Sequence, residues 1–297
     1  MSHPIHTIAV IGAGTMGQGI TYASCLAGYR TKLFDIDAAM LKKAKDYISN
    51  MLQKAVTKSL LSQDDAAKSV ARLEATTDFS SAVTNADFLI EVVPEKMDLK
   101  LDIFRRADAI AQPHVIFATN TSSLSVTEMA GATKRAAQVI GMHFFNPVPV
   151  MKLIEIIRGL ETSEQTIQST QAVAAAMKKE SVLINESPGF ITTRINAMIG
   201  NEAFYMLQEG VASAEEIDKA LKLGLNHPMG PFELVDLVGL DTRLHILNFL
   251  HSTLGEKFRP CPLMVKYVKA GRFGKKVGKG VYEYTPDGSR LDRATKS

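Results

Sequence analysis

Residues 8–19 read IAVIGAGTMGQG, an apolar run that ends in a glycine motif, Gly12-Ala13-Gly14-Thr15-Met16-Gly17. The run over residues 5–11 predicts a buried strand, and residues 15–27 predict the helix that follows it. Gly12 permits the tight turn, Gly14 lets the backbone approach a pyrophosphate, and Gly17 lets the helix pack closely on the strand. The helix N-terminus offers free N–H groups to phosphate oxygens. The motif predicts a dinucleotide site, although a plain strand–turn–helix rich in small residues would read similarly.

Asp35 strengthens the dinucleotide interpretation. It ends a second predicted strand, residues 31–34, and stands 18 residues after Gly17. A carboxylate there accepts hydrogen bonds from the adenosine ribose hydroxyls and repels a 2′-phosphate. Because no arginine follows Asp35 closely, we expect NAD rather than NADP. The alternative role for Asp35 is the N-cap of the next helix, and one carboxylate can serve in both.

Strands and helices then alternate along the chain, which predicts a mostly parallel, doubly wound sheet covered on both faces. The short turn-rich connection NPVPV between the last two strands predicts a hairpin and hence an antiparallel edge on that sheet. The further strands are expected at residues 88–93, 115–118, 139–145 and 152–157, with helices at 38–56 and 99–110.

The character of the sequence changes at Ser187-Pro188-Gly189, and helical patterns dominate from there to about residue 268. We therefore expect an α/β domain over residues 1–187 and an all-α domain over residues 188–284. Residues 285–297 read as a polar tail.

The composition is that of an ordinary globular protein, with 297 residues, 46% hydrophobic and 22% charged. This mix excludes disordered, collagen-like and disulfide-scaffold chains, and no apolar run approaches the roughly 20 residues of a membrane helix. The N-terminal sequence lacks the pattern of a secretory signal. Two cysteines, Cys25 and Cys261, suit a reducing cytoplasm and cannot make a zinc site, so we expect a cytoplasmic protein without a metal.

The net charge of +3 is small, but residues 257–279 carry basic side chains and no acidic one. Such a run is a solvated face or a surface that meets an anionic ligand. A nucleic-acid-binding domain would be more basic, so no nucleic-acid partner is expected.

Two further segments carry candidate chemistry. The loop Asn120-Thr121-Ser122-Ser123 follows a predicted strand, where its hydroxyls can bind a ligand or cap the next helix. The segment His143-Phe144-Phe145-Asn146-Pro147 precedes Glu155 by one hairpin, which can bring the imidazole alongside the carboxylate. Such a pair suits general base catalysis, or else it is a structural histidine with a hydrogen-bonded carboxylate.

Six segments together resemble the 3-hydroxyacyl-CoA dehydrogenases, with the bacterial 3-hydroxybutyryl-CoA dehydrogenases the most similar group. They are GAGTMGQGI, NTSSL, HFFNPVPVMKLIEI, PGFITTR, HPMGPFELVDLVGLD and GKKVGKGVYEY, and the resemblance runs from about residue 5 to residue 284. The resemblance implies an NAD-binding Rossmann domain and a helical C-terminal domain that mediates dimerisation, hence a homodimer acting on an acyl-CoA. The reaction implied is the reversible oxidation of a (3S)-3-hydroxyacyl-CoA to the 3-oxoacyl-CoA.

The resemblance also implies roles for individual residues. His143 would be the catalytic base, Glu155 its orienting partner and Ser122 the donor to the substrate 3-oxygen, while Asn146 would position substrate and nicotinamide. Contacts to the cofactor ribose and nicotinamide are implied for Glu95 and Lys100, a further cofactor contact for Lys276, and coenzyme A contacts for Lys54 and Lys58.

One position departs from the family pattern. The family reads PGF-x-x-Asn-Arg and its asparagine touches the substrate, whereas Thr193 fills that position here. Asn196 lies three residues further on nearly the same helix face, so either side chain can supply the acyl-pocket contact.

Two other classes of protein are compatible with parts of this sequence. A related gulonate-type sugar-acid dehydrogenase carries an HFFNP-like segment, and a non-catalytic crystallin-like protein can be built on the same fold. The intact set His143, Glu155, Ser122 and Asn146 argues against the second.

Overall fold

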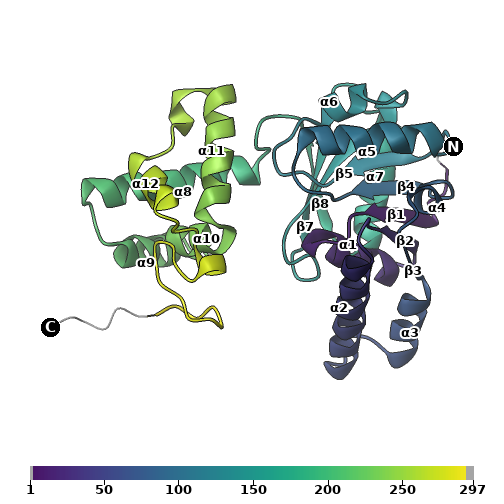
Figure 1. Cartoon of the computed structure of the whole chain (residues 1–297), viewed down its shortest axis with the longest axis horizontal. Coiled ribbons are helices and arrows are strands. Elements are labelled where there is room, and N and C mark those ends of the chain that lie inside the picture. Colours follow the sequence, from purple (N-terminus) through teal and green to yellow (C-terminus); the bar gives the residue numbers. More distant parts are fainter. Residues whose placement is uncertain (1–2, 292–297) are drawn as a thin grey trace. The chain divides into compact units, whose positions relative to one another are not determined.

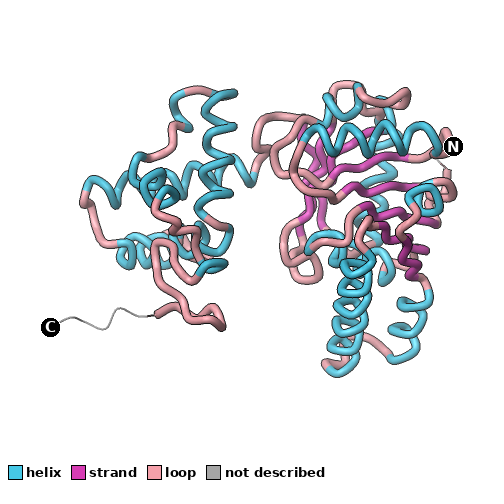
Figure 2. The backbone as a smooth tube through the Cα atoms, in the orientation of Figure 1, coloured by secondary structure: helices cyan, strands magenta, loops and turns pink. Residues whose placement is uncertain are grey.

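The computed structural model describes residues 3–291, and these divide into two compact units, Met1–Ser187 and Pro188–Ser297. The first unit is a single sheet with helices on both faces, and the second is helical (Figures 1 and 2). The predicted fold class, a doubly wound α/β sheet followed by an all-α region, is confirmed. None of the helices among the described residues is both long and apolar enough to cross a membrane.

The sheet has the strand order β3-β2-β1-β4-β5-β6-β7-β8. Strands β1 to β6 run parallel, and β7 pairs antiparallel with β6 as the NPVPV hairpin predicted. A further strand, β8, pairs in parallel with β7. Two strands rather than the expected one therefore run antiparallel to the rest of the sheet. The strands are β1 (Thr7–Ile11), β2 (Arg30–Phe34), β3 (Leu73–Thr76), β4 (Phe88–Glu91), β5 (Ile116–Thr119), β6 (Val139–Phe144), β7 (Leu153–Arg158) and β8 (Glu180–Asn185).

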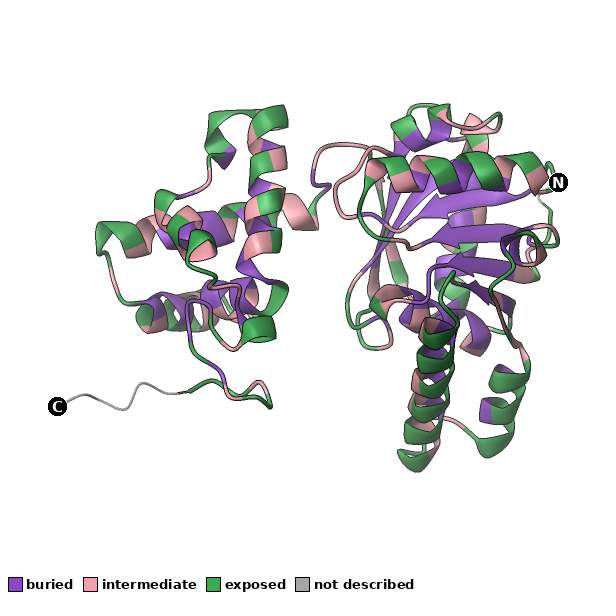
Figure 3. Cartoon of the chain, in the orientation of Figure 1, coloured by how far each residue is buried: buried purple, intermediate pink, exposed green. Residues whose placement is uncertain are grey.

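The central strands are buried on both faces, which accounts for their continuous apolar sequences (Figure 3). The edge strands β3 and β8 were not predicted. Each contains polar residues and is partly exposed, so neither has a continuous apolar sequence. The helices of this unit are α1 (Thr15–Leu26), α2 (Ala38–Thr57), α3 (Gln63–Ala71), α4 (Phe79–Val83), α5 (Met97–Ile110), α6 (Val126–Gly131) and α7 (Glu164–Ala176), with a 3-10 turn η1 (Ala136–Gln138).

The second unit packs its helices around an apolar cluster centred on Phe204, Phe232 and Phe258. Gly210 stands directly after α8 with a φ of +74°, the left-handed conformation that ends many helices. Ser213 caps α9 by accepting a hydrogen bond from the Glu216 N–H at 3.2 Å. The helices are α8 (Thr192–Glu209), α9 (Ala214–Gly224), α10 (Pro231–Val238), α11 (Leu240–Leu254) and α12 (Pro262–Lys269), with 3-10 turns η2 (Glu256–Phe258) and η3 (Lys275–Val277).

The segment after α12 is held by two buried carboxylates. Asp236 accepts hydrogen bonds from the N–H groups of Val281 and Tyr282 and from the Tyr284 hydroxyl, at 2.8 to 2.9 Å. Asp218 accepts one from the Tyr282 hydroxyl at 2.8 Å.

The first part of the expected polar tail folds back on this segment. Arg290 pairs with Tyr284 in an isolated bridge, and its guanidinium lies 4.4 Å from the centre of the Tyr282 ring. This turn could not be predicted, because its contacts join residues that belong to no periodic pattern. The rest of the expected tail, residues 292–297, lies outside the described residues.

Candidate active site

The glycine turn lies at the carboxyl end of β1 and leads directly into α1. Gly12 has a φ of +116°, and a side chain there would stand 2.9 Å from the Val92 carbonyl oxygen. A Cβ on Gly17 would lie 1.8 Å from the Gly12 carbonyl oxygen, so only glycine lets the helix pack this closely. A Cβ on Gly14 would meet nothing within 4 Å, which leaves open space at the helix N-terminus.

The rest of the motif joins this turn to its surroundings. The Ala13 N–H donates to Asp35 Oδ2 at 2.8 Å, Thr15 begins α1 with an exposed side chain, and Met16 packs against the sheet core. Asp35 is thus tied to the turn by its carboxylate. Its Oδ1 accepts from the Asp37 N–H at 3.0 Å, and Asp37 rather than Asp35 is the N-cap of α2. The alternative role of Asp35 as the helix cap is therefore wrong.

His143 and Glu155 face each other across the β6–β7 pair. They are register partners in the antiparallel ladder, so both side chains leave the same face of the sheet. The Nδ1 of His143 lies 2.7 Å from Glu155 Oε2. The carboxylate is fully buried and the imidazole is 6% exposed, so solvent screens this pair little.

Ser122 completes a relay on the other side of the imidazole. Its Oγ lies 3.1 Å from His143 Nε2. An ionised carboxylate only accepts hydrogen bonds, so Glu155 selects the tautomer that carries its proton on Nδ1. The Nε2 lone pair then faces the Ser122 hydroxyl, and this nitrogen can take a proton from a hydroxyl bound beside it.

An aromatic ring borders this relay. The Phe145 ring centre lies 4.6 Å from that of His143. Asn146 is exposed in the connection between β6 and β7, three residues after His143.

Glu95 organises the loop that carries Ser122. Its Oε1 accepts hydrogen bonds from the Thr121 hydroxyl and, at 3.0 Å, from the Ser122 N–H. Thr121 in turn accepts from the N–H of Leu124 at 2.9 Å. Asn120 ties the same loop to β6, because its Oδ1 accepts from the Phe144 N–H at 2.9 Å. The structure therefore links Glu95 to Ser122 directly.

Lys100 is fully buried and lies between two carboxylates. Its Nζ stands 2.8 Å from Glu91 Oε1 and 3.4 Å from Glu95 Oε2. Glu91 is also fully buried, and burial raises the pKa of its carboxyl against the opposing effects of Lys100 and the Thr119 hydroxyl. Any influence of Lys100 on a ligand would pass through Glu95, whose side chain is 37% exposed.

Glu91 was missed in the sequence, although a signal was present. It is the one charged residue in the apolar stretch FLIEVV over residues 88–93, and a charge in a buried strand requires a partner. Thr119 and Thr121 gave no comparable signal, since hydroxyl residues are common in loops.

The remaining candidates on the first unit are the two lysines near the end of α2. Lys54 and Lys58 are both exposed, and Lys58 is the C-cap residue. The structure gives them solvent-facing positions on a helix that projects from the sheet (Figure 1).

Three candidates belong to the second unit. Thr193 is half-buried in the first turn of α8, and Asn196 is exposed on the same helix. The Lys276 ammonium contacts both carboxylate oxygens of Asp241 at 2.6 Å. Burial raises the pKa of Asp241, but the hydrogen bond and charge of Lys276 and the backbone N–H donors together outweigh burial and lower that pKa.

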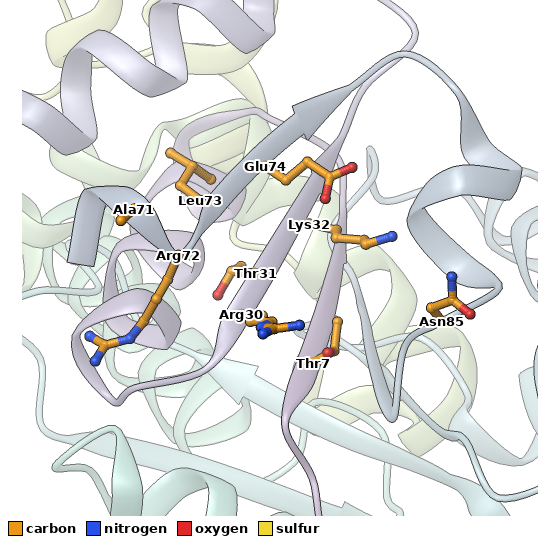
Figure 4. Close-up of a pocket in the computed structure, with 9 residues that line it drawn as sticks. All are labelled: Thr7, Arg30, Thr31, Lys32, Ala71, Arg72, Leu73, Glu74 and Asn85. Carbon is orange, nitrogen blue, oxygen red and sulfur yellow. The ribbon is translucent and has the colours of Figure 1, made fainter. Parts of the chain in front are cut away.

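A groove of about 630 Å³ lies at the other end of the sheet, beside the start of β2 (Figure 4). Its lining includes Thr7, Arg30 and Leu73, which begin β1, β2 and β3. In doubly wound sheets ligands bind beyond the carboxyl ends of the strands, where Gly12, Asp35 and Ser122 stand. This groove is therefore separate from the candidate active site.

Comparison with known proteins places the chain among dehydrogenases. Residues 7–187 match the family description "3-hydroxyacyl-CoA dehydrogenase, NAD binding domain", and residues 189–284 match "3-hydroxyacyl-CoA dehydrogenase, C-terminal domain". A probable 3-hydroxybutyryl-CoA dehydrogenase of Bacillus subtilis is 45% identical over 94% of this chain and 98% of its own. The 3-hydroxybutyryl-CoA dehydrogenase of Bradyrhizobium diazoefficiens is 42% identical over 96% of this chain and 97% of its own.

The solved structures agree with the sequence comparison. The crystal structure of (S)-3-hydroxybutyryl-CoA dehydrogenase from Ralstonia eutropha superposes with a TM-score of 0.92 at 42% identity. The superposition covers 95% of this chain and 100% of the Ralstonia eutropha chain.

Proposed function

The chain belongs to the 3-hydroxyacyl-CoA dehydrogenase family and is an NAD-dependent enzyme, and from that premise we propose that its substrate is a short-chain (3S)-3-hydroxyacyl-CoA. Relatives named 3-hydroxybutyryl-CoA dehydrogenase, matched over nearly their whole length, support a four-carbon acyl group. The reaction is the reversible oxidation of the 3-hydroxyl to the 3-oxo group. The same relatives argue against a sugar-acid substrate and against a non-catalytic protein.

The observation that carries the chemical assignment is the Ser122–His143–Glu155 relay, with contacts of 3.1 and 2.7 Å. In the oxidative direction His143 Nε2 accepts the proton of the substrate hydroxyl, and Glu155 stabilises the imidazolium that forms. The Ser122 hydroxyl holds the C3 oxygen, and Asn146 positions the substrate. General base catalysis of this kind contributes about 10²–10⁴-fold.

The glycine turn and its neighbours fit NAD. The open space at Gly14 and the close packing at Gly12 and Gly17 make room for a pyrophosphate against the α1 N-terminus. Asp35 would accept hydrogen bonds from the ribose hydroxyls. NAD, when bound, supplies the acceptor for the C3 hydride.

Further cofactor contacts are proposed on both units. Glu95, backed by Lys100, would bind near the nicotinamide ribose, since its half-exposed carboxylate borders the Ser122 loop. Lys276 would add a contact from the second unit.

For the acyl-CoA we propose that Lys54 and Lys58 contact the coenzyme A phosphates, which their exposed ammonium groups suit. Thr193 or Asn196 would contact the acyl portion. We therefore propose that residues 1–187 form the NAD-binding domain and carry the catalytic residues and the coenzyme A contacts. Residues 188–284 would supply the acyl contact, the Lys276 cofactor contact and the dimer interface.

A homodimer formed by the helical unit is supported by large apolar side chains exposed at the end of α9 and on α10. Leu223 is 77% exposed, Leu225 65% and Leu237 52%. Analytical ultracentrifugation of the wild type is expected to give twice the 32.4 kDa chain mass, and Leu223→Asp with Leu225→Asp is expected to shift it toward one chain. We also propose a cytoplasmic location, which the two free buried cysteines support.

The test is a spectrophotometric assay of NADH oxidation with acetoacetyl-CoA. The wild type is expected to turn over, and His143→Ala to lose about 10²–10⁴-fold in kcat while keeping its affinity for NADH. Near-normal turnover by His143→Ala would overturn the assignment. Activity of the wild type with gulonate and NAD, but not with 3-hydroxybutyryl-CoA, would favour the sugar-acid alternative.

A further inference from the structure

Among the described residues, one group of three side chains has the composition of a metal site: His3, Asp87 and His114. The three come from separate segments at the amino end of the parallel strands. His3 precedes β1, Asp87 directly precedes β4, and His114 precedes β5. His143 lies near the carboxyl end of β6, so this group is at the other end of the sheet from the candidate active site. No metal was expected from the sequence, so this group is found only in the structure.

The two imidazoles converge on one oxygen atom. The Nε2 of His3 lies 3.3 Å from Asp87 Oδ1, and the Nε2 of His114 lies 3.1 Å from the same atom. All three ligand atoms lie within 4.8 Å of one another. In a tetrahedral zinc site with bonds of roughly 2.0–2.2 Å, neighbouring ligand atoms are about 3.3 Å apart. The two separations from Asp87 Oδ1 match this value and the two Nε2 atoms lie within 4.8 Å of each other, so one ion can bind all three atoms.

The carboxylate is already fixed for this role. Asp87 Oδ2 accepts hydrogen bonds from the N–H groups of His6 and Thr7 at 2.8 and 2.9 Å. This leaves Oδ1 directed at the two imidazoles, as backbone-held carboxylates are in metal sites. The Asp87 side chain is 15% exposed, whereas His3 and His114 are 49% and 31% exposed, so an ion can enter and keep a water ligand.

We propose that His3 Nε2, His114 Nε2 and Asp87 Oδ1 bind one Zn²⁺ ion, with water as the fourth ligand. Two imidazoles and one carboxylate are ligands that zinc takes with three protein groups and an open position. The ion would hold residues 3–6 against the amino ends of the central strands β4 and β5. Its role is structural and does not depend on the dehydrogenase reaction.

The competing explanation is a hydrogen-bonded group in which both imidazoles donate Nε2–H to Asp87. The two explanations make different predictions for zinc, because a metal requires both Nε2 lone pairs. His114→Gln tests this directly, since the amide can still donate to Asp87 but is a poor zinc ligand.

The experiment is isothermal titration calorimetry of ZnCl₂ into the untagged, EDTA-treated full chain. We expect one saturable site in the wild type, weakened at least about tenfold in both His3→Ala and His114→Gln. His251→Ala is the matched control: His251 is 34% exposed and pairs with the single carboxylate of Glu256 at 3.1 Å, so its loss should leave zinc affinity unchanged. Cobalt absorption spectra of the same proteins report the coordination geometry.

Two outcomes would overturn the proposal. One is the lack of any saturable site in the wild type at sub-millimolar zinc, which would leave the hydrogen-bonded group as the explanation. The other is equal zinc affinity in the wild type and in His114→Gln. Neither outcome bears on turnover of acetoacetyl-CoA, so failure of this proposal is distinguishable from failure of the proposed function.

Discussion

Glu155 stands directly across the antiparallel ladder from His143, and its Oε2 lies 2.7 Å from the imidazole Nδ1. Strand register fixes this relationship, so the carboxylate is held by the backbone of β7 rather than by a flexible loop. Both side chains are buried, and their electrostatic coupling is therefore strong.

Glu155→Gln should preserve the shape of this pair but remove the charge that stabilises an imidazolium. We expect kcat for acetoacetyl-CoA reduction to fall by about 10²-fold or more, with little change in the KM for NADH. Steady-state kinetics measures both constants. A kcat close to that of the wild type would show that His143 acts without its carboxylate.

Ser122→Ala removes the hydroxyl that lies 3.1 Å from His143 Nε2. Because one hydrogen bond to the reacting oxygen is lost, kcat/KM for acetoacetyl-CoA should fall about tenfold, or ~1.4 kcal/mol. Ser123→Ala, one residue along the same loop, is the control and should retain most activity. Equal losses in the two variants would point to loop disruption instead.

Asp35→Ala should weaken NAD binding and narrow the preference for NAD over NADP. A hydrogen bond to a charged group is worth about 1.5–3 kcal/mol, so the KM for NAD should rise at least about tenfold. Asp37→Ala is the matched control, since it removes the α2 cap and costs stability without touching the ribose site. Kinetics with both cofactors decides, and an unchanged preference in Asp35→Ala would refute the ribose role.

Lys100→Met leaves the Glu91 carboxyl buried without its cation. Loss of one partner of a buried pair costs about 3–5 kcal/mol, so the melting temperature should drop. Burial already raises the pKa of Glu91, and removal of Lys100 raises that pKa further. A carboxyl with a raised folded pKa contributes most stability below its unfolded pKa of about 4.3 and loses it as the pH rises.

Calorimetry of Lys100→Met should therefore give a larger loss of stability at pH 8 than at pH 5. The double variant with Glu91→Gln should recover part of the loss, because the Val93 N–H can still donate to the amide oxygen and the Thr119 hydroxyl can accept from the amide NH₂. A loss independent of pH would mean that Glu91 is ionised in the folded variant throughout this range, as it is in the unfolded chain.

Asp236→Asn tests how the last segment is held to the helical unit. The carboxylate accepts three hydrogen bonds, from Val281, Tyr282 and Tyr284. The amide of asparagine has only one oxygen, so at least one buried donor loses its acceptor. We expect a loss of about 1–3 kcal/mol in the stability of this unit, measured by thermal unfolding. Asp287→Asn, on an exposed turn, should change the melting temperature little.

The local features of this protein were predictable from sequence because neighbouring residues determine them. The turn at Gly12 needs a positive φ, and the apolar stretch of β4 reports a strand buried on both faces. The hairpin between β6 and β7 could also be predicted, since its connection is short and rich in proline. That hairpin brought His143 and Glu155 into the same hypothesis.

The sequence by itself determined the α/β order, the glycine turn and the His143–Glu155 pair, all of which depend on short stretches of chain. Only the tertiary structure decided that β8 extends the sheet, that Glu91 pairs with Lys100, and that Asp87 joins His3 to His114. Parallel strands are joined by long crossover connections, so residues at the ends of neighbouring strands lie far apart in the sequence. No local sequence pattern can therefore predict those contacts. The chemistry of individual residues was thus visible in the chain, whereas their partners were set by the order of strands in the sheet.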